Sequence, residues 1–282
     1  MRTWFITGAS RGFGALIAKA ALDAGDAVVA TARNPDDVTK ALGDHGNLLA
    51  VRLDVTDQDQ ANDAVAAAIE RFGRIDVLVN NAGFGVVGAV EEASAEEIER
   101  VYATNVFGLL GVTRAVLPHM RRQRSGRVFN LSSVGGYASR AGFGIYCSTK
   151  FAVEALSEAL HGELEPLGIH VTVVEPGAFR TDFLDGTSLA PHARRIEDYD
   201  QTSGQTRAWS SANNYAQQGD PAKLAAAIVR LADEARPPLR IQFGSDTVAV
   251  VEAKNAFVAG ELAQWRNLAL STDYPAEELA GA

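Results

Sequence analysis

Apolar and polar positions follow two different rhythms along this chain. Short runs rich in β-branched residues are apolar throughout, which is typical of strands buried on both faces of a parallel sheet. Between them lie longer stretches in which apolar residues recur with the helical period. This alternation predicts βαβ units and a parallel sheet with helices on both faces. We expect strands at residues 3–7, 27–32, 48–53, 75–80, 126–131, 169–175 and 239–243.

The first expected strand runs into a turn that is rich in glycine. Gly8, Gly12 and Gly14 follow it and precede an apolar-periodic helix that extends to about Gly25. Such glycines let the backbone turn sharply, approach a ligand closely and pack the helix on the strand. The free amides at the helix start would then face an anion such as a pyrophosphate. A glycine loop without a ligand is the alternative, but the flanking strand and helix favour a nucleotide site.

Tyr146 and Lys150 form a second chemical signal. The two residues are four positions apart, so they share one face of a helix. A phenol has an ordinary pKa of about 10, and we expect the nearby ammonium to favour phenolate and lower that pKa. An isolated pair of this kind would more often be a surface aromatic beside a surface lysine. Here the pair accompanies the glycine turn.

Further motifs follow in a fixed order along residues 3–181. They are TGxxxGxG at 7–14, Asp54 after the third strand, NNAG at 80–83, Asn105 in a helix, Ser133, the Tyr146 and Lys150 pair, and Pro176-Gly177 followed by Thr181. In this order and spacing the chain resembles the short-chain dehydrogenase/reductase family. The resemblance implies an α/β fold, a single-domain Rossmann-like doubly wound parallel sheet of seven strands with helices on both faces, and a ligand site beyond the strands' carboxyl ends.

The resemblance also implies an oxidoreductase in which a nicotinamide cofactor carries the hydride. Tyr146 would exchange the proton, Lys150 would hold the nicotinamide ribose, and Ser133 would donate to the substrate oxygen. Ser133 is preferred to Ser132 because its spacing from the tyrosine is the one that the family uses. Asn105 would hold a water beside the lysine. Considered alone, that asparagine would be read as a surface residue or a local kink.

The choice between NAD and NADP is argued from the end of the second expected strand. NAD-selective sites usually place a carboxylate there, where it binds the ribose 2′-hydroxyl. This chain has Ala32 at that position and Arg33 next to it, and Arg11 lies in the glycine turn. Both arginines can meet a 2′-phosphate, so NADP(H) is predicted in preference to NAD(H). The alternative is that Arg33 is a solvated surface arginine and that Arg11 is a loop residue without a ligand.

Other expected cofactor contacts rest on the resemblance. Asp54 would contact the adenine amine, or it would cap the following helix instead. Pro176 and Gly177 would turn the chain beside the nicotinamide, unless they form a simple turn. The expected cofactor-binding residues are Gly8, Ser10, Arg11, Gly12, Phe13, Gly14, Arg33, Asp54, Val55, Asn81, Ala82, Gly83, Tyr146, Lys150, Pro176, Gly177, Phe179 and Thr181.

Composition narrows the choice of partners. The 282 residues, 47% of them hydrophobic, can bury one substantial core and are short for two domains. The net charge is −9 without a basic tract, so a small-molecule substrate is expected rather than nucleic acid or a membrane. No apolar stretch reaches the roughly 20 residues of a membrane span. Because the first strand follows Met1 directly, we expect no signal peptide and a cytoplasmic location.

Neither cysteine nor histidine indicates a metal or a nucleophile. Cys147 is the single cysteine, which excludes an internal disulfide. It adjoins Tyr146, but adjacent helical positions point about 100° apart, so we expect a packed small residue. The five histidines lack metal-ligand spacing, and no metal site is predicted.

Two regions depart from the general pattern. Residues 183–219, called the substrate segment below, are long and polar, and in the family this stretch closes over substrate. The C-terminal part has a helix-like stretch at about 244–270 and resembles retinol and hydroxysteroid dehydrogenase relatives. It puts a tetramer in doubt and makes a monomer or homodimer at least as favourable an expectation.

The predicted function is NADPH-dependent, reversible reduction of an aldehyde or ketone to an alcohol. Phe84, Phe143, Phe179 and Val134 suggest a partly apolar pocket, although core packing explains each phenylalanine equally well. One alternative is a hydroxysteroid or retinoid dehydrogenase, which shares the chemistry and differs in the pocket. Another is a non-catalytic NADP(H)-sensing protein, because fold does not fix function.

Overall fold

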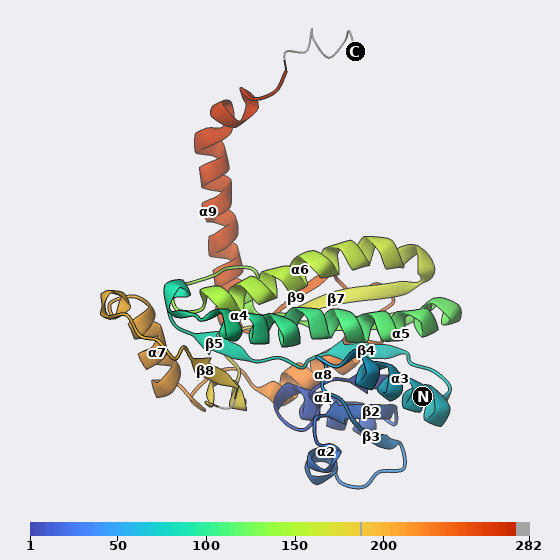
Figure 1. Ribbon diagram of the computed structural model, residues 1–282. Coiled ribbons are helices and arrows are strands. Elements are labelled where there is room, and N and C mark those ends of the chain that lie inside the picture. The colour runs from blue at the N-terminus through green and yellow to red at the C-terminus, as the bar shows by residue number, and fades with distance from the viewer. Residues whose placement is uncertain (187, 275–282) are drawn as a thin grey trace.

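The computed structural model describes residues 1–186 and 188–274, so position 187 of the substrate segment and residues 275–282 of the expected domain lie outside the described residues. Within them, seven parallel strands form one sheet in the order β3-β2-β1-β4-β6-β7-β9 (Figure 1). This order confirms the single doubly wound sheet expected from the sequence. The strands are β1 (Thr3–Ile6), β2 (Ala27–Ala32), β3 (Leu48–Arg52), β4 (Val77–Asn80), β6 (Gly126–Leu131), β7 (Ile169–Pro176) and β9 (Arg240–Phe243).

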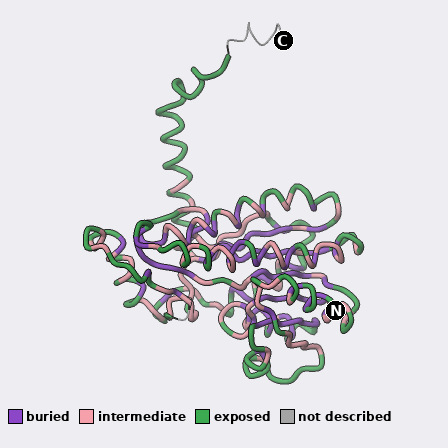
Figure 2. Tube along the Cα trace, in the orientation of Figure 1, coloured by how far each residue is buried: buried purple, intermediate pink, exposed green. Residues whose placement is uncertain are grey.

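Helices cover both faces of the sheet. On one face α1 (Gly12–Asp23) and α8 (Pro221–Leu231) pack with Trp4 and Ile6 of β1. On the other, α3 (Gln58–Phe72), α5 (Leu109–Gln123) and α6 (Gly144–Leu164) form a core with Phe5. Successive residues of β1 therefore enter opposite cores, which explains why its sequence is apolar throughout. Figure 2 shows the buried strands between the two helical layers.

Side-chain caps fix where several helices begin. Asn34 caps α2 (Pro35–Leu42), Asp57 caps α3, and Asp220 caps α8. Ser94 forms a capping box with Glu97 in α4 (Ala95–Tyr102). The shorter helical turns are η1 (Val90–Glu92), the π-helical η2 (Ala103–Gly108), η3 (Val134–Gly136) and η4 (Glu165–Leu167).

The substrate segment folds against the body through a second, smaller sheet. In it β8 (Leu189–Pro191) pairs in parallel with β5 (Gly85–Val87), which the sequence did not predict. The segment begins next to η5 (Asp182–Leu184) and continues through η6 (Glu197–Tyr199) and α7 (Ser203–Ala212). It lies at the end of the molecule where α4, β5 and the start of α6 meet (Figure 1).

The last helix leaves the body. α9 (Ser245–Leu270) follows β9 and points away from the sheet and its covering helices (Figure 1). It is exposed along most of its length (Figure 2). No helix in the described ranges is long and apolar enough to cross a membrane.

Candidate active site

A large cleft lies beyond the carboxyl ends of the sheet strands. Its volume is about 1150 Å³, and sites for one small molecule usually hold about 300–1,000 Å³. The cleft therefore has room for a dinucleotide together with a substrate. Every expected cofactor-binding residue except Gly14 lines it, and so does Ser133. Asn105 lies behind the wall and is buried.

The glycine turn has the geometry that a pyrophosphate site requires. Gly8 and Gly12 have φ angles of +64° and +55°, which L side chains rarely adopt. A Cβ on Gly14 would lie 2.3 Å from the Gly8 carbonyl oxygen, so α1 packs tightly on the turn. Asn81 Nδ2 donates to the carbonyl oxygens of Thr7 (2.9 Å) and Gly8 (3.0 Å) and holds the loop. The open backbone at the start of α1 fits a dinucleotide phosphate.

Arg33 and Arg11 take different positions on the cleft wall. Strand β2 ends at Ala32, and Arg33 follows it as an exposed residue lining the cleft. Arg11 also lines the cleft, but its Nη2 donates to Ser188 Oγ at 2.8 Å. It thus contacts the substrate segment. Arg33 is the cation next to Ala32, the position from which the choice between NAD and NADP is argued in the sequence.

Asp54 does not cap the helix that follows it. Its carboxylate accepts hydrogen bonds from the backbone N (3.0 Å) and Oγ1 (2.7 Å) of Thr56, which form a local turn. The cap of α3 is Asp57, whose Oδ1 accepts from the backbone N of Asp59 at 3.0 Å. Of the two roles expected for Asp54, the capping role is therefore wrong. Its place on the cleft wall is compatible with contact to an adenine.

Tyr146 is buried among aromatic rings. Its ring centroid lies 6.1 Å from that of Phe143 and 5.4 Å from that of Phe183. Burial raises the pKa of Tyr146 well above its usual value, and a hydrogen bond with Ser133 opposes this only in part. The expected lowering of this pKa by Lys150 is therefore wrong for this structure. Desolvation is the largest cause of this shift, and the ammonium, whose Nζ lies 5.9 Å from the ring centroid, does not reverse it.

The Lys150 ammonium is hydrogen-bonded to the end of strand β6. Its Nζ donates to the Leu131 carbonyl oxygen at 2.7 Å. Burial lowers the pKa of the ammonium to about 8, and the charge of Glu154 acts in the opposite direction. The lysine thus stays protonated below about pH 8, where it favours any negative charge that develops on the neighbouring phenol.

The structure separates the two candidate serines. Ser133 Oγ accepts from the backbone N of Gly135 at 3.0 Å and interacts with the Tyr146 hydroxyl. The Ser132 side chain lies near Glu154 instead. A Cβ on Gly136 would lie 2.3 Å from Ser132 Oγ and 3.0 Å from Glu154 Oε1, so both atoms are close to the same point. Ser133 is thus the serine beside the tyrosine hydroxyl.

Asn105 sits in the π-helical turn η2, a distortion often found at functional sites. Its Oδ1 accepts from the backbone N of Phe84 at 3.1 Å, and its Nδ2 donates to Thr149 Oγ1 at 3.1 Å. A Cβ on Gly83 would lie 3.1 Å from Asn105 Oδ1 and 3.7 Å from Lys150 Nζ. The ends of the Asn105 and Lys150 side chains therefore both lie close to Gly83.

A buried ionic cluster under the site was not anticipated. Arg240 Nε lies 2.9 Å from Glu154 Oε2 and 3.5 Å from Glu175 Oε1. Burial raises the pKa of both carboxyls, that of Glu175 to about 7. The sequence did hold a signal, because Glu154 continues the helical face of Tyr146 and Lys150 one turn further.

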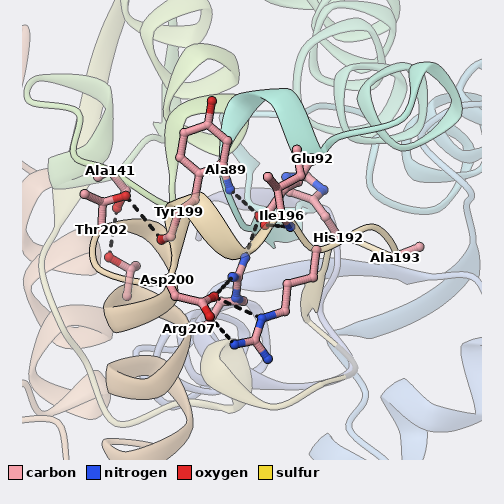
Figure 3. A network of polar contacts seen from close by, with 12 residues as sticks. Ala89, Glu92, Ala141, His192, Ala193, Ile196, Tyr199, Asp200, Thr202 and Arg207 are labelled. Atoms are coloured by element: carbon pink, nitrogen blue, oxygen red, sulfur yellow. Dashed lines mark hydrogen bonds and ion pairs between the residues drawn. The ribbon is translucent and has the colours of Figure 1, made fainter.

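A second unanticipated feature is the attachment of the substrate segment to the body. The Glu92 carboxylate is fully buried and accepts from the backbone N of Ala89 (2.7 Å) and Ile196 (2.8 Å) and from Arg207 Nη1 at 2.5 Å (Figure 3). Burial alone would raise the pKa of Glu92, but these hydrogen bonds outweigh it and hold the pKa below its usual range. Glu92 thus binds the segment in its charged form.

Glu97 attaches the same segment at a second point. Its Oε2 lies 3.0 Å from His192 Nδ1, and its Oε1 accepts from the backbone N of Ala193 at 3.0 Å. The same carboxylate belongs to the capping box with Ser94. That box was the only sequence signal for this contact, and it did not indicate a tertiary partner.

The turn after β7 is braced by the start of α9. Asp246 Oδ2 accepts from the backbone N of Ala178 at 2.7 Å. A Cβ on Gly177 would lie 2.3 Å from the Asp246 carboxylate, so Asp246 would have to move to admit a side chain there. Thr181 follows on the cleft wall, where its Oγ1 accepts from the backbone N of Phe183 at 3.3 Å.

Cys147 is buried beside the site. Burial raises the pKa of its thiol, which disfavours the reactive thiolate. Within residues 1–186 and 188–274, no group of three or more His, Cys, Asp or Glu side chains is placed to hold a metal ion.

Comparison with known proteins agrees with this geometry. The model of the short chain dehydrogenase family matches residues 2–190. Oxidoreductase BOA17 of Botryotinia fuckeliana is 37% identical over 96% of this chain and 99% of that protein. The 3-ketodihydrosphingosine reductase of Bacteroides thetaiotaomicron is 38% identical over 89% of this chain and 90% of the reductase.

Solved structures extend the similarity to the whole fold. A short-chain dehydrogenase from Streptomyces avermitilis matches with a TM-score of 0.90 and 41% identity, covering 97% of this chain and all of that one. A Burkholderia phymatum relative in complex with NAD matches with a TM-score of 0.81 and 26% identity, over 92% of this chain and 95% of its own. The chain therefore belongs to the short-chain dehydrogenase family and is an oxidoreductase that uses a nicotinamide cofactor.

Proposed function

We propose that this oxidoreductase reduces an aldehyde or ketone to an alcohol with NADPH, in a reversible reaction. One observation carries the proposal. A single cleft has Arg33 beside Ala32 at the expected adenosine end, and Tyr146, Ser133 and Lys150 at the other. A guanidinium can bind a 2′-phosphate through paired hydrogen bonds, and the alanine brings no carboxylate to repel it.

The protein's own residues supply the proton chemistry. When bound, the nicotinamide cofactor supplies the hydride to the carbonyl carbon. Tyr146 donates its phenolic proton to the carbonyl oxygen, and Ser133 donates a hydrogen bond to the same oxygen as negative charge develops there. Lys150 then stabilises the phenolate that is left. In oxidation the phenolate takes the proton back.

The protonation state of Tyr146 supports reduction as the favoured direction near neutral pH. Because burial raises its pKa, the hydroxyl keeps its proton and is ready to act as a general acid. Lys150, with a pKa of about 8, is mainly charged at pH 7. The pair therefore holds one acid proton and one stabilising cation.

The phenolate must regain a proton after each reduction. Asn105 Oδ1 and Lys150 Nζ both approach Gly83, and we infer that a water bridges the two groups. Both groups can hydrogen-bond that water. We infer a path from solvent through the lysine to the tyrosine, with Asn105 as the group that positions the water.

The walls near Tyr146 favour a carbonyl substrate with apolar substituents. Phe84, Phe143, Phe183 and Leu184 line the cleft there. The similarity to the 3-ketodihydrosphingosine reductase supports a ketone on an aliphatic chain. We propose aliphatic ketones as the first substrate class, with ketosteroids and retinoid aldehydes as the alternatives.

A cofactor and substrate panel tests this function. Purified protein is mixed with NADPH or NADH and with aliphatic 3-ketones, ketosteroids, retinoid aldehydes and simple aldehydes, and cofactor absorbance is followed. We expect turnover with NADPH, fastest with an apolar ketone. Tight NADPH binding without turnover across the panel would contradict a reductase and favour a cofactor-sensing protein.

A further inference from the structure

α9 exposes more large apolar side chains than a solvated helix would. Val258, Leu262, Trp265 and Leu268 are 47%, 58%, 56% and 62% exposed, and Phe257 is 58% exposed. The helix runs out from the body, so the body does not cover them (Figures 1 and 2). Contiguous exposed apolar surface of this kind marks an interaction site. We propose that α9 pairs antiparallel with α9 of a second copy of this chain and forms a homodimer.

Most of the exposed apolar residues share one side of the helix with two opposite charges. At about 100° per residue, an arc of roughly 100° contains eight positions of α9. Five are apolar, two are the charged Lys254 and Glu261, and one is Thr247, which is buried against the rest of the molecule. The five apolar positions are Val250, Phe257, Val258, Trp265 and Leu268.

The charges select one pairing register. In an antiparallel pair that overlaps fully, Ser245 lies opposite Leu270 of the other helix. Lys254 then faces the partner's Glu261, and Val250 faces the partner's Trp265. Phe257 faces the partner's Val258 on either side of the twofold axis. Full overlap thus gives two opposite-charge pairs around an apolar centre, whereas a parallel pair would place like charges together.

The contact area is adequate for a dimer. The apolar side chains of the arc, together with Leu262, expose about 100 Å² each, on the order of 600 Å² per helix and 1,200 Å² for the pair. This is the lower end of the range for specific protein interfaces. A helix of 26 residues is about 39 Å long, so the folded bodies of the two copies lie at opposite ends of the pair.

A second copy fits these charges better than a membrane surface. α9 carries Lys254 and Arg266 against Asp246, Glu252 and Glu261, so it has no basic face for anionic lipid. The base of the helix is also fixed. Tyr137 Oη donates to Asn255 Oδ1 at 2.5 Å, and Asp246 holds the turn after β7. A fixed helix pays little ordering entropy when it binds.

The pairing would bring a second chain to the mouth of the cleft. Val250 lines the cleft and lies on the pairing arc. In the full-overlap register the partner's Trp265 reaches the level of Val250, which is 39% exposed. Each copy would then cover part of the other's cleft entrance.

Charge reversal in the full-length protein tests both the pairing and its register. Sedimentation measures the dimer dissociation constant of the parent, Lys254→Glu, Glu261→Lys and the double variant. We expect each single reversal to raise that constant on the order of tenfold, because it creates two like-charge pairs, and the double reversal to restore it. A monomeric parent, or a double variant as weak as the singles, would overturn the proposal.

Cysteine cross-linking tests the face, with a control on the neighbouring side of the helix. Phe257→Cys lies at the axis and should form a disulfide-linked dimer under mild oxidant. Ala256→Cys, one position away among the small residues, should not, and the native Cys147 is buried. Cross-linking of Ala256→Cys alone would overturn the chosen face. Binding of the parent as a monomer to neutral lipid vesicles would overturn the dimer.

Discussion

The contact between Arg207 and Glu92 should decide how firmly the substrate segment is held. Arg207→Met keeps the aliphatic stem and removes the cation from a fully buried carboxylate. Removing one partner of a buried pair typically costs about 3–5 kcal/mol. Two backbone N–H donors to Glu92 remain, and the Arg207 side chain is 20% exposed. We therefore expect about 2 kcal/mol, which is roughly a 30-fold larger population of the detached segment.

Hydrogen exchange measures this population directly. In Arg207→Met the backbone amide of Ile196, which donates to Glu92, should exchange about 30 times faster than in the parent. The KM for substrate should rise by no more than the same factor, because only the attached state completes the cleft wall.

Arg195→Met is the matched control. This arginine also pairs with an acidic residue of the segment, Asp200, but its side chain is 66% exposed. Exposed pairs contribute about 0–1 kcal/mol, so exchange should change less than about fivefold. Equal exchange rates in Arg207→Met and the parent would refute the attachment role, and equal effects in the two variants would refute the importance of burial.

Acid should loosen the same contact. The pKa of Glu92 is held below its usual value in the folded protein, so its contribution is complete above the unfolded pKa of about 4.3. It is lost as pH falls through the lowered folded value. Exchange at Ile196, corrected for intrinsic pH dependence, should therefore stay constant from pH 8 to 5 and rise only in stronger acid. A rise that begins near pH 6 would contradict this.

Three other variants test the cofactor end, the lysine and the glycine turn. Arg33→Ala should weaken NADPH binding by roughly 10- to 100-fold by titration and leave NADH binding unchanged, because a charge-assisted hydrogen bond contributes about 1.5–3 kcal/mol; an equal loss for both cofactors would contradict it. Glu154→Gln removes a charge that raises the pKa of Lys150, so the alkaline limb of kcat/KM should move below its parental position near pH 8, whereas Glu158→Gln, which contacts the same arginine from the surface, should not move it. Gly14→Ala places a methyl 2.3 Å from a backbone oxygen and should lower the thermal midpoint by several degrees, and a parental midpoint would contradict the close packing.

The strands of the sheet could be predicted because each one is recognisable from a short run of neighbouring residues. Each strand is a short apolar run beside a glycine or polar turn, and parallel βαβ units permit few arrangements. The expected strand at 126–131 matches β6 at both ends. The expected strand at 75–80 begins two residues before β4, since buried Ile75 belongs to the core but not to the ladder.

The attachment of the substrate segment could not be predicted. β5 and β8 have three residues each and pair across about a hundred positions, so neither shows a period. Glu92 and Arg207 are likewise distant in sequence, and nothing near either residue indicates burial. Their contact depends on tertiary packing alone.

The pKa of Tyr146 shows what a spacing argument omits. Four residues of separation place Lys150 on the same helical face, and this holds in the structure. The spacing says nothing about Phe143 and Phe183, which desolvate the phenol and reverse the direction of the shift. Electrostatic direction requires knowledge of burial as well as of charge.

The role of Tyr146 as the proton donor is the central claim, and one measurement tests it most directly. Tyr146→Phe keeps the ring between Phe143 and Phe183 and removes only the hydroxyl. Single-turnover reduction of a responsive ketone by enzyme-bound NADPH should slow by about 10²–10⁴-fold, while the NADPH dissociation constant stays within about threefold. Parental single-turnover rates in this variant would contradict the account.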